Sequence, residues 1–400
     1  GKRRRPGTLT GGFAMNGISL TEEQQAILGG VSGPATALAL RTVVEYGRAF
    51  GARRLVPIKS AHLAGSLGTF LYKAYYEVLK RLVDEGASVR VPTTVNPRPG
   101  HDLNLINRVV FMLQKTLEDS FQKLGVTPNY SCVCYEGANV PGIGDVLGWA
   151  ESSAVQYANS VLGARVNRNS VLVDLCSAVT GLTPEYGYLL DENRRARLLV
   201  KLAVKTMDAP ALGFVLGKKA VNRVPVLTHH PFTQSELKNM GAAMAASGAV
   251  ALFHVEGLTP EAPDLRHVLD DASPETVTIT QEDLDGLRAK SAAPPGLVVF
   301  GCPHASLAEA KALAQRFSGK KVRCRTWLCI SPEAGEKFAQ TPEHEALAKA
   351  GVEIHNFCPL AALTLRVGRG AVLSCSAKLY YYLAGSLYGT TDDCLAACGA

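Results

Sequence analysis

The hydrophobic positions of this chain follow helix-like and strand-like spacing in turn. Apolar residues recur at helical spacing over Ala35 to Phe50, Tyr72 to Glu85 and Leu103 to Leu124. Short apolar runs of the kind that forms buried strands stand between them, at Arg54 to Ile58 and Ala87 to Val91. This alternation predicts an α/β protein with mostly parallel sheets.

The same alternation resumes in the second half of the chain. Helical spacing covers Ser235 to Ser247 and Pro342 to Ala350. Capping boxes at Thr21 to Gln24 and Ser306 to Glu309 predict where two further helices begin. Strand-like runs lie at Ala249 to Val255, Leu297 to Phe300, Lys321 to Ile330 and Val352 to His355.

The chain length argues for more than one packed unit, because 400 residues exceed what one hydrophobic core usually serves. Proline-containing stretches at Pro225 to Thr233 and Ala272 to Pro274 mark weak boundaries. We predict a tail or linker over residues 1–19, a first α/β portion over 20–230 and a second over 231–400. Residue 1 is Gly rather than Met, so we expect a processed, tagged or truncated chain.

Composition excludes several classes of protein. The chain is 47% hydrophobic and 19% charged, which is ordinary for a globular protein. Part of the net charge of +7 lies in the opening GKRRRP, and the other basic residues are mixed with acids, which argues against a nucleic-acid surface. No apolar run reaches the ~20 residues of a membrane helix, and no secretory signal is evident. We therefore expect a cytoplasmic protein with no nucleic-acid or membrane partner.

Ten cysteines without a signal peptide favour buried thiols or metal ligands over a disulfide framework. Cys302 and Cys358 each precede a proline and each follow a predicted strand. Ligands of open α/β sheets bind at the carboxyl ends of strands, and iron–sulfur sites use cysteines in such turns. Two buried thiols are the alternative. A third ligand could come from Cys132 or Cys134 in SCVCYEGANVPG, or from Cys176.

Two polar clusters also follow predicted strands. Lys59, Ser60 and His62 come after the first strand, and Thr93, Thr94 and Asn96 after the second. Hydroxyls and backbone amides at such ends can hold a carboxylate or phosphate, although each cluster alone is as consistent with a cap or a turn. A thiol hydrolase using Cys302 with His304 is disfavoured, because these residues lie too close in sequence for a nucleophile and its base.

The segment 148–168, GWAESSAVQYANSVLGARVNR, carries polar groups on every side of a presumed helix. It resembles a segment of the aconitase X family, in particular of its large subunit or catalytic domain. The resemblance extends in consistent order through SAH at 60–62, VPTTVN at 91–96, TGLTP at 180–184, DENR at 191–194, SGAVALFHVEGLTPEA at 247–262, GCPH at 301–304 and the turn at Cys358.

This resemblance implies an aconitase-like catalytic domain of several α/β/α subdomains and an iron–sulfur-dependent hydro-lyase. Members of the family dehydrate cis-3-hydroxy-L-proline or mevalonate 5-phosphate, and a separate or fused swivel domain closes over the cluster. We find no swivel sequence in this chain, so we expect it to need a small subunit. The expected substrate is a small hydroxy acid, first cis-3-hydroxy-L-proline. The alternatives are mevalonate 5-phosphate and a degenerate homologue that only binds.

The resemblance also implies roles for individual residues. Cys302, Cys358 and Cys176 match cluster ligands, with Cys132 as the alternative to Cys176. The catalytic residues implied are His62, Glu151, Ser152 and Ser153. The substrate-binding residues implied are Ser60, Thr93, Thr94, Asn96, Asn159, Arg165, Ser376 and Lys378.

Three positions depart from the family pattern. Cys375 stands in place of an Asn, Tyr381 in place of a His, and Lys59 in place of a small or apolar residue. The added cation at Lys59 suggests a different anionic substrate.

Overall fold

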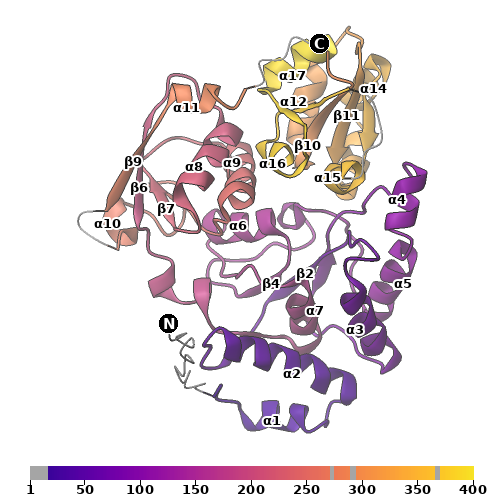
Figure 1. Ribbon diagram of the computed structural model, residues 1–400, viewed down its shortest axis with the longest axis vertical. Helices are drawn as coiled ribbons and strands as arrows, with labels where there is room; N and C mark the ends of the chain where they lie inside the picture. Colours follow the sequence, from indigo (N-terminus) through magenta and orange to yellow (C-terminus); the bar gives the residue numbers. More distant parts are fainter. Residues whose placement is uncertain (1–16, 271–273, 289–293, 365–369) are drawn as a thin grey trace, which may run out of the picture.

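The computed structural model describes residues 17–270, 274–288, 294–364 and 370–400. Residues 1–16, which hold most of the predicted tail and its basic opening, lie outside the described residues. The chain folds into three α/β units, each with its own largely parallel sheet (Figure 1). Within the described ranges, no helix is both long and apolar enough to cross a membrane.

The first unit is built round the three-stranded parallel sheet β3-β2-β4, with an antiparallel pair β1-β5 beside it. Helices α2 and α7 pack on each other, and α7 lies against β2. The elements are α1 (Glu22–Leu28), α2 (Pro34–Ala49), β1 (Leu55–Pro57), β2 (Ser60–Leu63), α3 (Lys73–Asp84), β3 (Thr93–Val95), α4 (Leu105–Val110), α5 (Gln114–Leu124), β4 (Leu147–Trp149), α6 (Ser152–Ser160), α7 (Val171–Thr180) and β5 (Leu182–Pro184).

The second unit has a four-stranded parallel sheet of order β8-β7-β6-β9, covered by the closely packed helices α8 and α9. Its elements are β6 (Leu198–Ala203), α8 (Ala209–Ala220), β7 (Pro225–Leu227), α9 (Gln234–Gly248), β8 (His254–Val255), α10 (Leu265–Val268), β9 (Glu275–Thr280) and α11 (Gln281–Asp285). The position 230/231, at which two portions were expected to meet, lies within this unit, in the loop between β7 and α9. The proline-containing stretch from Pro225 to Thr233 begins with β7 itself and ends at the N-cap of α9.

The third unit has a five-stranded parallel sheet of order β12-β11-β10-β13-β14. Its elements are β10 (Leu297–Ala305), α12 (Leu307–Arg316), β11 (Arg325–Ile330), α13 (Pro332–Ala339), α14 (Pro342–Ala350), β12 (Glu353–His355), α15 (Pro359–Leu363), β13 (Val372–Ser374), α16 (Ala377–Tyr382), β14 (Leu387–Tyr388) and α17 (Thr391–Cys398).

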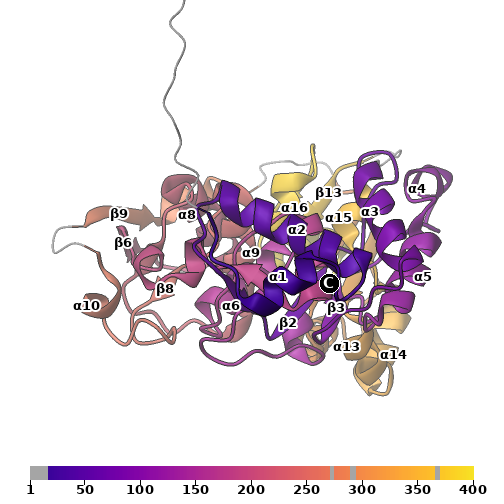
Figure 2. The ribbon, with the colours of Figure 1, turned by 90° about the horizontal axis from the view of Figure 1, so that it is seen from below.

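The three units meet at one junction. In Figure 1 the second and third units lie side by side above the first, with α6, α9, α15 and α16 facing the space between them. Contacts of α9 with α6 and α16 hold the three units together there. Figure 2, seen from below, shows α1 and α2 across the face of the first unit that is turned away from this junction.

The predicted α/β class with mostly parallel sheets is confirmed, as are the capping boxes at Thr21 and Ser306. The predicted helix over 103–124 is wrong in one respect, since it forms two helices, α4 and α5. Thr69 explains the break, because its amide donates to Val110 O and its hydroxyl accepts from Leu113 N. These two bonds replace bonds that a continuous helix would make along its own axis.

Two predicted strand positions also differ from the structure. Residues 60–62 follow the predicted strand, which forms as β1, but they belong to a strand themselves, the buried β2. The predicted strand at 87–91 does not form, and residues 93–94 belong to the buried strand β3. Their backbone groups are satisfied by sheet pairing, so they are not free to bind an anion at a strand end. The apolar run Ala249 to Val255 forms a strand only at its last two residues.

Candidate active site

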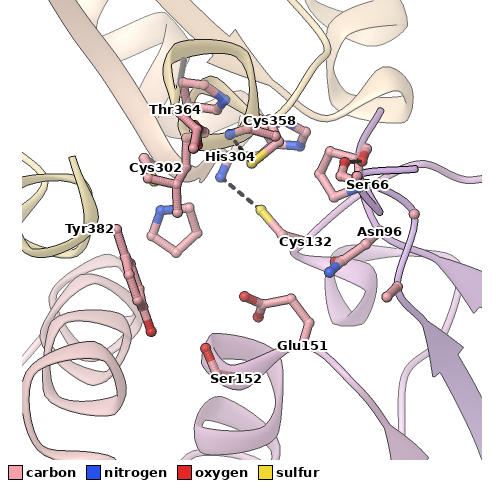
Figure 3. A pocket seen from close by; sticks show the side chains of 18 of the residues that line it. Ser66, Asn96, Cys132, Glu151, Ser152, Cys302, His304, Cys358, Thr364 and Tyr382 are labelled. Atoms are coloured by element: carbon pink, nitrogen blue, oxygen red, sulfur yellow. Dashed lines mark hydrogen bonds between the residues drawn. The ribbon is translucent and has the colours of Figure 1, made fainter. Parts of the chain in front are cut away.

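A cavity of about 500 Å³ opens at the junction, between the first and third units (Figure 3). The first unit contributes the loop after β2, the loop after β3, the start of α6 and Cys132. The third unit contributes the end of β10, the start of α15 and two residues of α16. The ends of parallel strands thus supply much of its wall, as in other α/β proteins that bind ligands.

Cys302 reaches the cavity because β10 is irregular where it occurs. The pairing of β10 with β11 shifts register between Phe300 and Ala305, and Gly301 takes φ +87° at this point. A Cβ atom at Gly301 would lie 1.9 Å from Cys329 O, so only glycine fits. Cys302 was expected just beyond the strand and lies instead within its irregular end.

Cys358 lies at the first turn of α15, as its N-cap residue. Its Sγ accepts a hydrogen bond from Ala361 N at 3.4 Å, and its own amide donates to Arg98 O at 2.8 Å. The second bond ties the start of α15 to the loop after β3 in the first unit. The position of this thiol therefore depends on contact between two units.

Cys132 is the third thiol in the cavity wall. Its Sγ accepts a hydrogen bond from His304 N at 3.3 Å, which Figure 3 draws as a dashed line. The ring of His304 bonds at Nε2 to Phe357 O, 3.1 Å away, next to Cys358. One residue thus connects the three segments that carry Cys132, Cys302 and Cys358.

His304 itself is fully buried. Burial lowers the pKa of its imidazole to about 4, so the ring is neutral at physiological pH. Since a carbonyl can only accept, the ring proton is on Nε2 and Nδ1 carries a lone pair. Nδ1 has no hydrogen-bond partner among the described residues.

The three thiols fit an iron–sulfur cluster better than a single metal ion. In the part of the chain that the structure describes, no group of three His, Cys, Asp or Glu side chains is close enough to bind one ion. A cluster spans more space and takes cysteine thiolates as ligands. Burial raises the pKa of Cys302 to about 12 and also raises that of Cys132 and Cys358, so a positively charged partner is needed for their thiolates.

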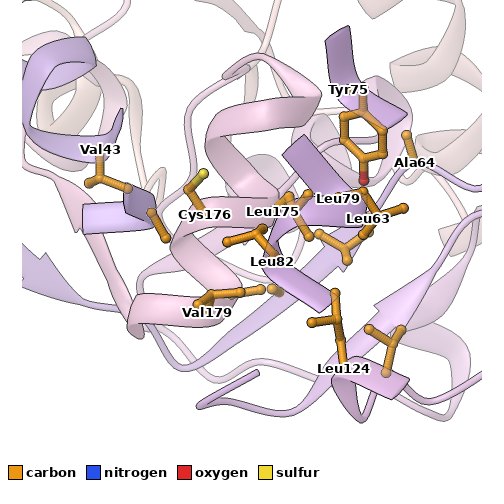
Figure 4. Packing of buried hydrophobic residues seen from close by; sticks show 14 of the residues in the cluster. Val43, Leu63, Ala64, Tyr75, Leu79, Leu82, Leu124, Leu175, Cys176 and Val179 are labelled. Atoms are coloured by element: carbon orange, nitrogen blue, oxygen red, sulfur yellow. The ribbon is translucent and has the colours of Figure 1, made fainter. Parts of the chain in front are cut away.

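Cys176 does not lie at this site. It is fully buried on α7 in the hydrophobic core of the first unit, close to Val43, Leu82 and Val179 (Figure 4). Helix α7 has eight buried positions and packs on α2 and β2, so the Cys176 sulfur is enclosed in the core and does not reach the cavity. The structure instead brings Cys132 together with Cys302 and Cys358.

Glu151 and Lys378 form a buried ion pair at the cavity wall. Lys378 Nζ lies 2.6 Å from Glu151 Oε1 and 3.0 Å from Ser153 Oγ. Glu151 also caps α6 by accepting from Ala154 N and from Ser153 Oγ, each at 2.6 Å. Ser152, next to them, lines the cavity.

The charges of this pair stabilise each other. Burial alone would raise the pKa of Glu151, but the charge and hydrogen bonds of Lys378, with those from Ser153 and Ala154, hold that pKa below its usual value. Burial alone would lower the pKa of Lys378, and the charge of Glu151 raises it instead. Both groups are therefore ionised at neutral pH, and Glu151 is not a proton donor there.

His62 does not reach the cavity but controls a residue that does. Asn139 Nδ2 donates to Thr94 Oγ1 at 3.0 Å, and Thr94 Oγ1 contacts His62 Nδ1 at 2.8 Å. His62 Nε2 lies 3.0 Å from Asn96 Oδ1, so it donates there and Nδ1 accepts from Thr94. Burial lowers the pKa of His62 to about 4, which keeps the ring neutral.

This chain of hydrogen bonds, here called the His62 relay (Asn139, Thr94, His62 and Asn96), fixes the side-chain amide of Asn96. Its oxygen is occupied by His62, which leaves the NH₂ group for the cavity that Asn96 lines (Figure 3). Asn96 therefore presents a hydrogen-bond donor, and His62 acts on the site only through it.

The other expected site residues lie outside the cavity wall. Ser60 Oγ accepts from Trp149 Nε1, and Thr93 Oγ1 donates to Val91 O. Asn159 is buried and bonds to Val166 and Ala251. Arg165 pairs with Asp191, and Lys59 is exposed at the other end of β2.

Ser376 also lies outside this wall, but it supports it. Its Oγ donates to Cys302 O and accepts from Leu379 N at 3.0 Å, which caps α16. Ser376 thus holds the backbone of a candidate ligand from behind. Lys378, two residues further along the chain on α16, lines the cavity.

Sequence reasoning missed Asn107 and Tyr382, which both line the cavity. Asn107 is almost fully buried on α4 and donates to Gly100 O and Ala362 O, joining the first and third units. A polar residue among apolar positions of the predicted helix was the available signal. His304 was visible within GCPH, but nothing in the pattern indicated that it joins three segments.

Comparison with known families matches three consecutive domains. Residues 17–192 match the aconitase X first domain, 196–289 the second and 295–400 the third. The chain belongs to the aconitase X family. Its three matched domains coincide with the three sheets described above.

Several relatives have named activities. The chain is 37% identical to the phosphomevalonate dehydratase large subunit of Methanosarcina mazei, over 94% of this chain and 96% of the relative. It is 40% identical to that of Thermococcus kodakarensis over 78% and 81%. The cis-3-hydroxy-L-proline dehydratase of Pseudomonas aeruginosa is 32% identical, over 92% of this chain and 67% of the relative.

A crystal structure of Thermococcus kodakaraensis aconitase X in its holo form superposes with a TM-score of 0.82 at 33% identity. The match covers 92% of this chain and 97% of that one. Fold, family and the dehydratase names of the relatives agree, so this member of the aconitase X family is an enzyme, a hydro-lyase.

Proposed function

We propose that this chain is the large subunit of a phosphomevalonate dehydratase. With a small subunit, it eliminates water from mevalonate 5-phosphate at an iron–sulfur cluster held by Cys132, Cys302 and Cys358. The observation that carries this proposal is the convergence of three thiols, from three segments distant in sequence, on one cavity beside the buried pair of Glu151 and Lys378.

The choice of substrate rests on the relatives. Phosphomevalonate dehydratase large subunits are 37% and 40% identical to this chain, against 32% and 29% for two cis-3-hydroxy-L-proline dehydratases. Cys176, which the resemblance implied as a cluster ligand, is a core residue and gives no support to either substrate. cis-3-Hydroxy-L-proline, first expected from the sequence, becomes the second candidate, supported by the Pseudomonas aeruginosa enzyme.

The residues of this chain would bind and orient the substrate. The Lys378 ammonium and the Asn96 amide both present donors to the cavity and suit the oxygens of a hydroxy acid. Glu151 holds Lys378 in place, and His304 keeps the cysteine segments together. A bound cluster supplies a Lewis acid for the hydroxyl that leaves.

The proton that must leave the substrate needs a base, and the titratable groups of this cavity among the described residues are poorly suited to that role. Glu151 is ion-paired, and the three thiols are assigned to the cluster. The lone pair of His304 Nδ1 is fully buried and weakly basic, because burial lowers the pKa of this ring to about 4. We therefore assign the base to the small subunit, which the name "large subunit" of the relatives implies.

The small subunit would dock on an exposed apolar patch at the cavity mouth, here called the mouth patch (Phe70, Leu71, Leu105, Val109 and Met112). Leu71 is 87% exposed and also lines the cavity. Phe70, Leu105 and Met112 are at least 60% exposed. An apolar patch of this kind beside a functional cavity is typical of a protein interface.

A direct test uses both subunits. The chain is produced with a small subunit from a phosphomevalonate dehydratase, reconstituted anaerobically with iron and sulfide, and assayed by mass spectrometry for loss of water. We expect mevalonate 5-phosphate to lose water and cis-3-hydroxy-L-proline to remain unchanged. Turnover of cis-3-hydroxy-L-proline but not of mevalonate 5-phosphate would make hydroxyproline the assigned substrate. A reconstituted pair that retains its cluster and dehydrates neither compound would overturn the proposed function.

A further inference from the structure

A second cavity, of about 460 Å³, lies between the second and third units. It shares Gly301, Cys302 and Pro303 with the candidate active site but otherwise has different walls. Its other lining includes Ser235 from the second unit and Cys375 from the third. The proposed function does not use this cavity, nor does it use Cys375, which departs from the family pattern.

Cys375 directly follows β13, and its neighbour in space is Cys394 on α17. Ser374 O accepts a hydrogen bond from Gly389 N at 3.2 Å, which brings the start of α17 to the end of β13. Cys394 Sγ lies 3.9 Å from Gly389 O. Cys375 packs against the hydrophobic cluster that contains Cys394, and the two thiols are close enough for each to shift the pKa of the other.

The two thiols differ in accessibility. Cys394 is fully buried in the core of the third unit, whereas Cys375 is half-buried and lines the second cavity. A small reagent in the cavity can therefore reach Cys375, whereas Cys394 lies behind it in the core. Redox-active cysteine pairs have this arrangement, an accessible thiol next to a resolving one. The neighbouring Cys394 also lowers the pKa of Cys375, which favours its thiolate.

We propose that Cys375 and Cys394 form a peroxide-reactive dithiol, with Cys375 as the attacking thiol and Cys394 as the resolving thiol. In the first step the Cys375 thiolate attacks one peroxide oxygen, the O–O bond breaks, and a sulfenic acid forms as hydroxide leaves. In the second step Cys394 sulfur attacks the sulfenic sulfur, the S–O bond breaks, and a disulfide forms with release of water. Two thiols lose two electrons in total, and hydrogen peroxide is reduced to two waters.

The pair is linked to the candidate active site through one residue. Ser376 follows Cys375 and donates its hydroxyl proton to Cys302 O. A disulfide at Cys375 changes the backbone position from which Ser376 makes this bond. Oxidation of the pair would therefore loosen the irregular end of β10 that carries Cys302.

Peptide mapping tests the chemistry directly. The purified full chain is treated with hydrogen peroxide, its remaining thiols are blocked with N-ethylmaleimide, and it is digested with trypsin without reduction. Lys378 lies between the two cysteines, so trypsin separates them and a disulfide appears as a cross-linked peptide pair. Cys394 and Cys398 share one tryptic peptide, which makes Cys398→Ser the matched control.

We expect a cross-link in the native chain and in Cys398→Ser, and none in Cys394→Ser. In Cys394→Ser, dimedone should trap a sulfenic acid at Cys375. The proposal is overturned if Cys375 stays unmodified while the half-buried Cys324 reacts. The proposal is also overturned if the cross-linked peptide pair persists in Cys394→Ser.

Hydrogen–deuterium exchange tests the link to the active site without an activity assay. After oxidation, amides of residues 301–305 should exchange faster in the native chain and at an unchanged rate in Cys375→Ser. Equal exchange of these amides in the native chain and in Cys375→Ser would show that oxidation is not coupled to the active site through Ser376. The reaction of the two thiols would then be a local modification only.

Discussion

Lys378 Nζ lies 2.6 Å from Glu151 Oε1, a contact that joins residues 227 positions apart in the chain. Glu151 belongs to the first aconitase X domain and Lys378 to the third. Both side chains are buried, with 8% and 9% of their surface exposed. The pair therefore does two things, since it fixes the cavity wall and fastens two domains to each other.

Loss of Lys378 should be costly because it leaves a buried carboxylate without its partner. Removing one member of a buried pair destabilises a protein by roughly 3–5 kcal/mol. We expect Lys378→Met to lower the denaturant midpoint strongly. The double variant Glu151→Gln with Lys378→Met should recover part of that loss. Strictly additive effects in this double-mutant cycle would show that the two charges do not interact.

The assignment of the third cluster ligand gives a sharp contrast between two cysteines. After anaerobic reconstitution, Cys132→Ser should retain much less iron than the native chain, whereas Cys176→Ala should retain the native amount. Cys176→Ala removes a sulfur from a packed core, so it should cost stability instead, on the order of 1–3 kcal/mol. Iron content by chemical assay, read beside thermal melting, separates the two effects. The opposite pattern would restore Cys176 as the ligand.

The His62 relay predicts that a buried imidazole affects catalysis without touching substrate. His62→Phe removes the donor to Asn96 Oδ1, so the amide of Asn96 can rotate. Misplacement of a binding group by about 1 Å can cost roughly 10²-fold in rate, and we expect kcat/KM to fall by about that factor. Thr93→Val is the matched control, because Thr93 is buried on β3 next to the relay residue Thr94 but lies outside the relay. An equal loss in the control would indicate a general structural effect.

Much of the fold could be predicted from the sequence, because periodicity and capping are local. Cys302 and Cys358 could also be predicted as a pair, since a strand followed by Cys-Pro marks a rigid turn. The choice between Cys132 and Cys176 as the third ligand could not be predicted from the sequence. It depends on which side of α7 faces the core, and nearly every position of that helix is buried.

The polar strands are the second limit of sequence reasoning. Ser60 to Leu63 alternate polar and apolar residues as a half-exposed strand would, and Thr93 and Thr94 are both polar, yet every residue of β2 and β3 is buried. Their hydroxyls and imidazole bond within the protein. Polarity alone therefore indicated substrate contacts where the structure has internal hydrogen bonds, and only Asn96 at the end of this series reaches the cavity.

Asp174 predicts a pH dependence of stability. Burial raises the pKa of this carboxyl to about 7, and a hydrogen bond from Asn169 offsets only part of that effect. Since the folded pKa lies above the unfolded value of 3.8, this group favours folding most below that value. Its contribution is lost as pH rises towards 7. Asp174→Asn should therefore stabilise the chain by about 2–4 kcal/mol at pH 8 and little at pH 4. Denaturant titrations at both pH values check this, and an equal effect at the two would contradict it.

The mouth patch predicts where the small subunit binds. Leu71 is 87% exposed and borders the cavity, and the Thr69 bonds to Val110 and Leu113 place it beside α4. A charge at the centre of an apolar interface is left without water or a partner when the subunits associate. Leu71→Glu should therefore weaken small-subunit binding at least about 10-fold, as measured by isothermal titration calorimetry.

Val31→Glu is the matched control for this measurement. Val31 is 75% exposed on the loop between α1 and α2, two helices that lie across the face turned away from the junction (Figure 2). The Val31→Glu variant should bind the small subunit with native affinity. Because both variants alter only exposed side chains, both should keep the native melting temperature and the native iron content. Equal weakening by the two charges would mean that net charge governs association. Native binding by Leu71→Glu would place the interface elsewhere and would leave the proposed cluster site untouched.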